Sequence, residues 1–94
     1  MKVHIEYLGV SRLVTQKKAE DLELPDGITF RDLARFLSEA YPKMIGYVIQ
    51  PGATDLQSPN IFNIDGKRMV RRDQMDDPIN DGDKIVLMSM SAGG

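Results

Sequence analysis

The chain contains no cysteine and no tryptophan, and its single histidine is His4. Without cysteine there can be no disulfide, no thiolate metal ligand and no cysteine nucleophile. A lone histidine also excludes zinc sites built mainly from cysteine and histidine. No neighbouring residue gives His4 a catalytic partner, so we expect an exposed or structural histidine. The sequence therefore predicts no bound metal, no bound cofactor and no catalytic residue in this chain.

Long apolar runs and an excess of positive charge are missing too. No apolar run reaches about 18 residues, and the N-terminus has no secretory signal, so we expect a cytoplasmic protein without membrane contact. Twelve Lys and Arg stand against 14 Asp and Glu, for a net charge of −2. A nucleic-acid binder usually carries a basic excess, so nucleic acid is not an expected partner.

Alternation of apolar and polar residues predicts strands near both ends of the chain. Residues 2–8 alternate with period two and place Val3, Ile5 and Tyr7 on one face. Residues 20–24 predict a second strand, so the mixed segment at residues 10–18 is expected to turn the chain back. Residues 84–88 are apolar on both faces, which is typical of a strand in the centre of a sheet.

A helix and a hairpin are predicted between these strands. Thr29 is a suitable N-cap with Asp32 three positions later, apolar residues then recur at helical spacing, and Pro42 ends the helix. Residues 50–60 indicate a surface loop. Asp65-Gly66 then predicts a tight hairpin turn, because this pair accepts positive φ angles. A further turn at residues 81–83 leads into the last strand.

The predicted order of elements is strand, strand, helix, hairpin and strand. If the first and last strands lie parallel and central in a mixed sheet, the single main helix packs across one of its faces. That arrangement is an α+β fold, the β-grasp fold of ubiquitin. We expect residues 1–89 to form this domain and residues 90–94 to form a flexible tail.

The tail consists of Met90, Ser91, Ala92, Gly93 and Gly94. Glycine has no Cβ, so such an end can pass through a narrow channel, and five extended residues reach about 17 Å. The Gly94 carboxylate is a poor electrophile until a leaving group is attached, and adenylation by ATP supplies one. The activated carbonyl could then accept sulfur or a lysine amine. The chain would be a carried substrate, and the catalysis would belong to its partner.

Five features of the chain occur together: the element order, the hairpin at residues 62–70, the Asp81-Gly82-Asp83 turn, the strand at residues 85–88 and the Gly93-Gly94 end. In this combination the chain resembles the ubiquitin-like sulfur carriers. That family includes the small subunit of molybdopterin synthase, the carriers for thiamine and cysteine biosynthesis, and the archaeal and eukaryotic modifiers.

The resemblance implies a role and partners. A ubiquitin-activating-type enzyme would use ATP to adenylate Gly94, and the resulting thiocarboxylate would donate sulfur to a synthase such as the molybdopterin-synthase large subunit. It also implies a partner surface that includes Tyr7 and Met88. Two alternatives stay open: a modifier conjugated through Gly94 to lysines of target proteins, and a noncovalent ubiquitin-like adaptor.

Two charged clusters have competing interpretations. The first cluster is basic and contains Lys67, Arg68, Arg71 and Arg72. It could contact nucleic acid or an acidic partner, but it has no interleaved aromatic residues. We therefore favour its interpretation as a charged edge of the hairpin that prevents pairing with another strand. A second cluster is acidic and contains Asp73, Asp76, Asp77, Asp81 and Asp83. Its spacing does not match a calcium loop, so we expect turn residues that offset nearby arginines.

Overall fold

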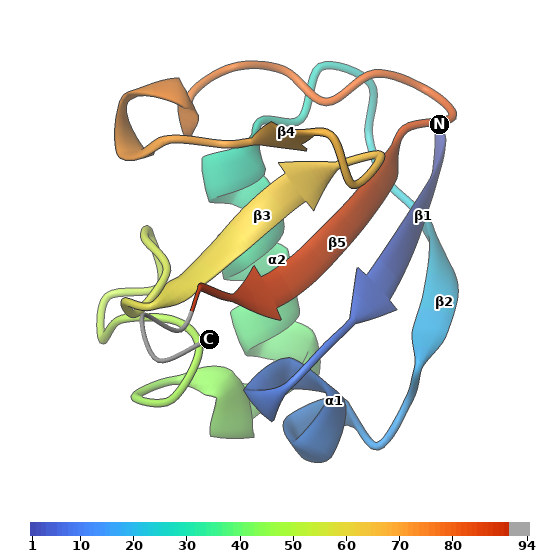
Figure 1. Cartoon of the computed structure of the whole chain (residues 1–94). Coiled ribbons are helices and arrows are strands. Elements are labelled where there is room, and N and C mark those ends of the chain that lie inside the picture. Colours follow the sequence, from blue (N-terminus) through green and yellow to red (C-terminus); the bar gives the residue numbers. More distant parts are fainter. Residues whose placement is uncertain (91–94) are drawn as a thin grey trace.

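The computed structural model describes residues 1–90 (Figure 1). Within these residues, five strands form one mixed sheet in the order β2-β1-β5-β3-β4. Their bounds are β1 Lys2–Tyr7, β2 Ala19–Glu23, β3 Asn60–Ile64, β4 Arg68–Met69 and β5 Lys84–Ser89. The strand β5 is therefore central, as its two apolar faces predict.

The pairing of the first and last strands confirms the β-grasp arrangement. β1 and β5 run parallel, with Tyr7 opposite Leu87, whereas β3 runs antiparallel to β5 on its other side. A parallel pair needs a long crossover between its strands, and this crossover holds all the other elements.

The main helix, α2 (Phe30–Ala40), lies across one face of the sheet (Figure 1). Its capping box forms as predicted, because the Asp32 N–H donates to Thr29 Oγ1 and the Thr29 N–H donates to Asp32 Oδ2, both at 3.1 Å. The hydrogen bond from the Thr29 backbone lowers the pKa of the Asp32 carboxyl. After the helix, Pro42 opens the short 3₁₀ helix η1 (Pro42–Met44).

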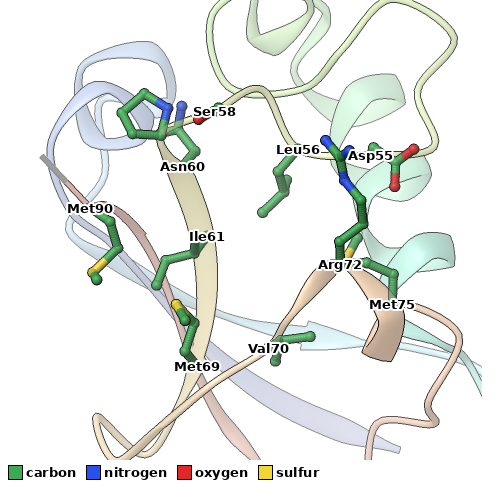
Figure 2. A pocket seen from close by; sticks show the side chains of 11 residues that line it. Asp55, Leu56, Ser58, Asn60, Ile61, Met69, Val70, Arg72, Met75 and Met90 are labelled. Carbon is green, nitrogen blue, oxygen red and sulfur yellow. The ribbon is translucent and has the colours of Figure 1, made fainter. Parts of the chain in front are cut away.

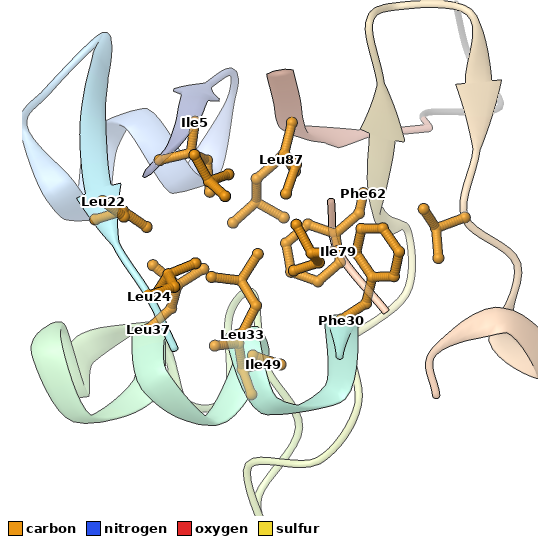
Figure 3. Packing of buried hydrophobic residues seen from close by; sticks show 14 of the residues in the cluster. Ile5, Leu22, Leu24, Phe30, Leu33, Leu37, Ile49, Phe62, Ile79 and Leu87 are labelled. Carbon is orange, nitrogen blue, oxygen red and sulfur yellow. The ribbon is translucent and has the colours of Figure 1, made fainter. Parts of the chain in front are cut away.

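The core lies between α2 and the sheet (Figure 3). Leu33 and Leu37 of α2 have no exposed surface and point toward the sheet. Phe30 and Phe62 place their ring centroids 6.0 Å apart in the same layer. Burial of these side chains, at roughly 1.5–3 kcal/mol each, drives the helix onto the sheet.

The predicted hairpin turn is confirmed. Asp65 and Gly66 both have positive φ, 57° and 71°, and the Lys67 N–H donates to the Ile64 carbonyl at 2.9 Å. Beyond β4, the segment to β5 contains the short 3₁₀ helix η2 (Arg72–Gln74).

Residues 10–18 turn the chain back as predicted, since β2 runs antiparallel to β1, but they do so through the helix α1 (Val10–Thr15), which the sequence pattern did not predict. Its buried side chains are polar: the Ser11 hydroxyl donates to the Leu8 and Leu87 carbonyls, and the Thr15 hydroxyl donates to the Ser11 carbonyl, while Val14 is half-buried against the core. One inward apolar residue does not make a stripe at helical spacing, which is the signal that the sequence pattern would need.

The loop at residues 50–60 is held to α2 by Arg31. Its guanidinium donates to the Thr54 carbonyl and to Asp55, each at 2.9 Å, and also to Asp76 at 2.8 Å. One side chain therefore joins two surface segments that are far apart in the sequence. None of the helices within residues 1–90 combines the length and apolar character that a membrane crossing requires.

Candidate functional site

The site begins where β5 ends. The side chain of Met90, the first residue after this strand, is exposed, and its backbone N–H donates to the Pro59 carbonyl at 2.8 Å. This hydrogen bond places the start of the tail beside the loop at residues 50–60. The predicted tail residues Ser91, Ala92, Gly93 and Gly94 lie outside the described residues.

An apolar patch covers the sheet face that α2 leaves open. We call Ile61, Met69, Val86 and Met88 the sheet-face patch. The strand register brings them together, since Ile61 lies opposite Met88, and Asn63 lies between Val86 on one side and Met69 on the other. Val86 is buried but stands outside the core cluster beneath α2, and Met88 is half-buried. Met88 is thus available to a partner, and its role in docking stays a prediction.

A pocket of about 270 Å³ continues from this patch (Figure 2). Ile61, Met69 and Met90 stand along one side of it, and Leu56 and Met75 along the other. The remaining lining residues are Asp55, Ser58, Pro59, Asn60, Val70 and Arg72. Methionine is unbranched and polarisable, so such a wall can adapt its shape to an apolar side chain of a partner.

Tyr7 does not belong to this surface, and the prediction that placed it there is wrong. Its side chain is 0% exposed. Tyr7 lies opposite Leu87 in the parallel register, and both face the core, whereas Met88 is one residue further along and faces the opposite side. Burial, followed by a hydrogen bond to Glu20, raises the pKa of the Tyr7 hydroxyl.

A polar network that the sequence pattern did not reveal surrounds Tyr7. The Tyr7 and Tyr41 hydroxyls each donate to Glu20 Oε2 at 2.6 Å, and Lys17 Nζ donates to Glu20 Oε1 at 3.2 Å. Burial alone would raise the pKa of Glu20, but the hydrogen bonds from Tyr41, Tyr7 and Lys17 outweigh it and lower this pKa. The network connects β1, β2 and the end of α2, so its role is structural.

Two members of the acidic cluster accept backbone hydrogen bonds, as expected of turn residues. Asp81 Oδ1 accepts the Lys2 N–H, and Asp83 Oδ2 accepts the Asn80 N–H, both at 2.9 Å. Asp76 pairs with Arg31, whose hydrogen bond lowers the pKa of that carboxyl. Within residues 1–90, no three His, Cys, Asp or Glu side chains gather in a way that could hold a metal ion.

The basic cluster divides between two settings. Arg68 of β4 is exposed, and Arg71 pairs with Asp73 at 3.2 Å. Arg72 instead lines the pocket beside the sheet-face patch. His4 is a partly exposed strand residue whose Nδ1 lies 2.8 Å from Asp21.

A mixed sheet with parallel β1 and β5, crossed on one face by a single main helix, defines the ubiquitin-like β-grasp proteins. The sequence profile of the ThiS family matches residues 5–94, and the chain belongs to the ThiS family. The match includes Gly93 and Gly94. No curated protein sequence matches the chain.

Solved structures of similar proteins share the fold over nearly the whole chain. The HVO 2177 protein of Haloferax volcanii is 24% identical, with a TM-score of 0.79 over 100% of this chain and 87% of that one. SAMP1 of the same organism is 15% identical, with a TM-score of 0.79 over 100% of both chains. A Pyrococcus furiosus protein named as a candidate molybdopterin converting factor, subunit 1, is 22% identical, with a TM-score of 0.72 over 94% and 95%.

Proposed function

We propose that this protein is a sulfur carrier whose Gly94 carboxylate is adenylated and then converted to a thiocarboxylate. The observation that carries the proposal is the ThiS-family match, which extends through the Gly93-Gly94 pair. The position of the tail supports it, because β5 brings the chain from the centre of the sheet directly to Met90 at the surface. The folded body serves as a handle, and residues 90–94 serve as the part that enters a partner.

The proposed chemistry takes place on the Gly94 carbonyl carbon. A Gly94 carboxylate oxygen attacks the α-phosphorus of ATP, pyrophosphate leaves, and an acyl adenylate forms. Hydrosulfide from a sulfur donor then attacks the carbonyl carbon, and AMP leaves with the original oxygen. One oxygen of the carboxylate is thereby replaced by sulfur, with no change of oxidation state at carbon. The chain itself holds no cysteine that could compete for the activated carbonyl.

The catalysis is assigned to partner proteins. A ubiquitin-activating-type enzyme would supply ATP and the adenylation site, and a synthase would accept the sulfur through contact with the sheet-face patch. The structural likeness to the candidate molybdopterin converting factor subunit favours a synthase of cofactor biosynthesis as the acceptor.

A second candidate function is covalent modification of lysines through Gly94. The likeness to SAMP1, a small archaeal modifier protein, favours it. Both functions begin with the same adenylation and differ in the nucleophile that attacks the activated carbonyl, which is sulfide in one and a lysine amine in the other. A noncovalent adaptor remains the third alternative and would need no chemistry at Gly94.

Intact-mass measurement separates these functions. The full chain is incubated with the activating enzyme of the same organism, Mg-ATP and sulfide. A carrier gains the mass difference between sulfur and oxygen, and the chain lacking Gly94 does not. If the mass never changes and loss of Gly94 leaves cellular function intact, the carrier proposal is wrong. Higher-mass conjugates in cells that vanish with the same deletion would assign the modifier role.

A further inference from the structure

The six methionines of the chain divide into two groups of three by their surroundings. Three of them pack in or against the core: Met1, Met44 and Met75. The other three lie outside the core cluster, and we call Met69, Met88 and Met90 the methionine cluster. Met69 is 42% exposed, Met90 is 53% exposed, and Met88 is half-buried on the open face of the sheet. Met44 and Met75 are only 0% and 4% exposed.

The methionine cluster surrounds Ile61 of β3. Met88 lies directly opposite Ile61 in the antiparallel register of β3 and β5. Met69 and Met90 stand with Ile61 along one side of the pocket beside the sheet-face patch (Figure 2). The Met90 N–H donates to the Pro59 carbonyl at 2.8 Å, which continues the pairing of β3 and β5 by one step. Met88 and Met90 therefore emerge on the same face of the sheet, because side chains alternate along a strand.

The reactive group of the cluster is the thioether sulfur. Since the chain has no cysteine, its methionines are the side chains that hydrogen peroxide oxidises most readily. A sulfur lone pair attacks one oxygen of the peroxide, the O–O bond breaks, and the other oxygen leaves as water. Sulfur loses two electrons, the peroxide gains them, and methionine sulfoxide forms. A methionine sulfoxide reductase reverses the step, in which two thiols become a disulfide and the sulfoxide oxygen leaves as water.

Oxidation would change the surface from apolar to polar. The thioethers adapt their shape to an apolar partner, whereas each sulfoxide oxygen is a hydrogen-bond acceptor that water solvates. The neighbouring side chains of Ile61 and Val86 carry no donor for it. A partner that covers the oxidised surface must therefore remove water from an acceptor without replacing the hydrogen bond, which is unfavourable.

We propose that Met69, Met88 and Met90 form an oxidation site, and that their conversion to sulfoxides by hydrogen peroxide prevents the sulfur acceptor from binding the sheet-face patch. The identity of the partner rests on the proposed function. The order in which the methionines are oxidised depends only on their exposure in the fold. Oxidation at this site would change the docking face at the base of the tail and leave the core intact.

Peptide mapping by mass spectrometry tests the oxidation site. The full chain is treated with hydrogen peroxide and sampled over time. Met69 and Met90 should be oxidised about tenfold faster than Met44 and Met75, because the reactivity of a thioether follows its exposure, and Met88 should fall between them. Circular dichroism and thermal unfolding should show that the oxidised chain keeps its fold.

Binding to the molybdopterin-synthase large subunit of the same organism tests the effect of oxidation. The chain is used with Gly94 as the free carboxylate, so that the peroxide acts on no thiocarboxylate. Oxidation followed by removal of the peroxide should weaken binding about tenfold. Methionine sulfoxide reductase with dithiothreitol should restore the affinity of the unoxidised chain.

The matched control is a triple variant with Met69→Leu, Met88→Leu and Met90→Leu. It keeps an apolar surface and the core methionines, but its surface cannot form sulfoxides. Its affinity for the subunit should be the same before and after treatment with peroxide.

Several results would overturn the inference. Equal oxidation rates at Met69, Met75 and Met90 would contradict the oxidation site. Unchanged affinity after complete oxidation of the cluster would exclude the effect on binding, and so would an equal loss in the triple variant, an unfolded oxidised chain, or a subunit that binds neither form. If peroxide abolishes binding but the wild type never forms a thiocarboxylate, the proposed function fails and the oxidation site stands. If the oxidised chain still delivers sulfur normally, the inference fails and the proposed function stands.

Discussion

The Tyr7 hydroxyl donates a 2.6 Å hydrogen bond to Glu20 Oε2, which pairs the end of β1 with a carboxylate of β2. Tyr41 donates to the same oxygen from the C-terminal end of α2, and the Tyr7 and Tyr41 rings meet edge to face with centroids 6.2 Å apart. One carboxylate thus satisfies two hydroxyls that are partly withdrawn from water.

Removal of that carboxylate should destabilise the fold. Glu20→Ala leaves two hydroxyl donors without their acceptor, and an unsatisfied buried donor costs about 1–3 kcal/mol. We expect the free energy of unfolding, measured by urea titration, to fall by at least that amount. Glu23→Ala is the matched control on the same strand, because Glu23 is exposed and should change stability by less than about 0.5 kcal/mol. Equal losses in both variants would contradict the role of the network.

Stability should also fall in acid through the same residue. The pKa of Glu20 lies below its ordinary value in the folded chain, as do those of Asp32 and Asp76. Their contribution is complete above the ordinary carboxyl pKa of about 4 and is lost as the pH falls through the lowered values. Thermal unfolding between pH 7 and pH 2 should show this loss. Glu20→Gln should make the acid dependence shallower, and an unchanged slope would assign it to the other carboxyls.

The capping box of α2 gives a third prediction. Thr29→Ala removes the side-chain acceptor for the Asp32 N–H and should lower the free energy of unfolding by about 1 kcal/mol. Thr29→Ser keeps an acceptor at the same place and should remain close to the wild type. A stable Thr29→Ala variant would mean that packing of α2 alone holds its first turn.

The sheet-face patch gives a fourth prediction. Met88→Asp places a carboxylate among Ile61, Met69 and Val86 and should weaken binding of the sulfur acceptor in a pull-down with the full chain. Since Met88 is half-buried on the open face, the variant should still fold. Leu87→Asp, one residue earlier and fully buried beneath α2, should not fold and marks the opposite face. Unfolding of Met88→Asp would show that Met88 is a core residue.

The Arg31 clamp gives the last prediction. Arg31→Met should release residues 50–60 and the segment around Asp76, which hydrogen exchange by mass spectrometry would detect as faster exchange in those two segments. Arg35→Met, an exposed position on the same helix, is the control and should leave exchange there unchanged. Exchange that stays slow in Arg31→Met would show that backbone contacts hold the loop.

Local patterns predicted the elements that depend on neighbouring residues. The alternation in β1, the Thr29 capping box and the Asp65-Gly66 turn all act within a few positions of the chain, and each forms as predicted. The helix α1 escaped prediction because the acceptor that holds Ser11 is the Leu87 carbonyl, 76 residues away. A bond of that span leaves no periodic trace in the sequence.

The sequence by itself determined the strands, the main helix and their order, because hydrophobic period and turn chemistry are local properties. It also placed Gly93 and Gly94 after the last strand. Only the tertiary structure decided which residues face a partner. The parallel register turns Tyr7 into the core and leaves Met88 outside. The side-chain hydrogen bonds of Ser11 and Arg12 to the Leu87 and Tyr7 carbonyls orient α1 so that Leu13 is exposed. Such a surface is assembled from distant segments, so it exists only once the sheet has formed.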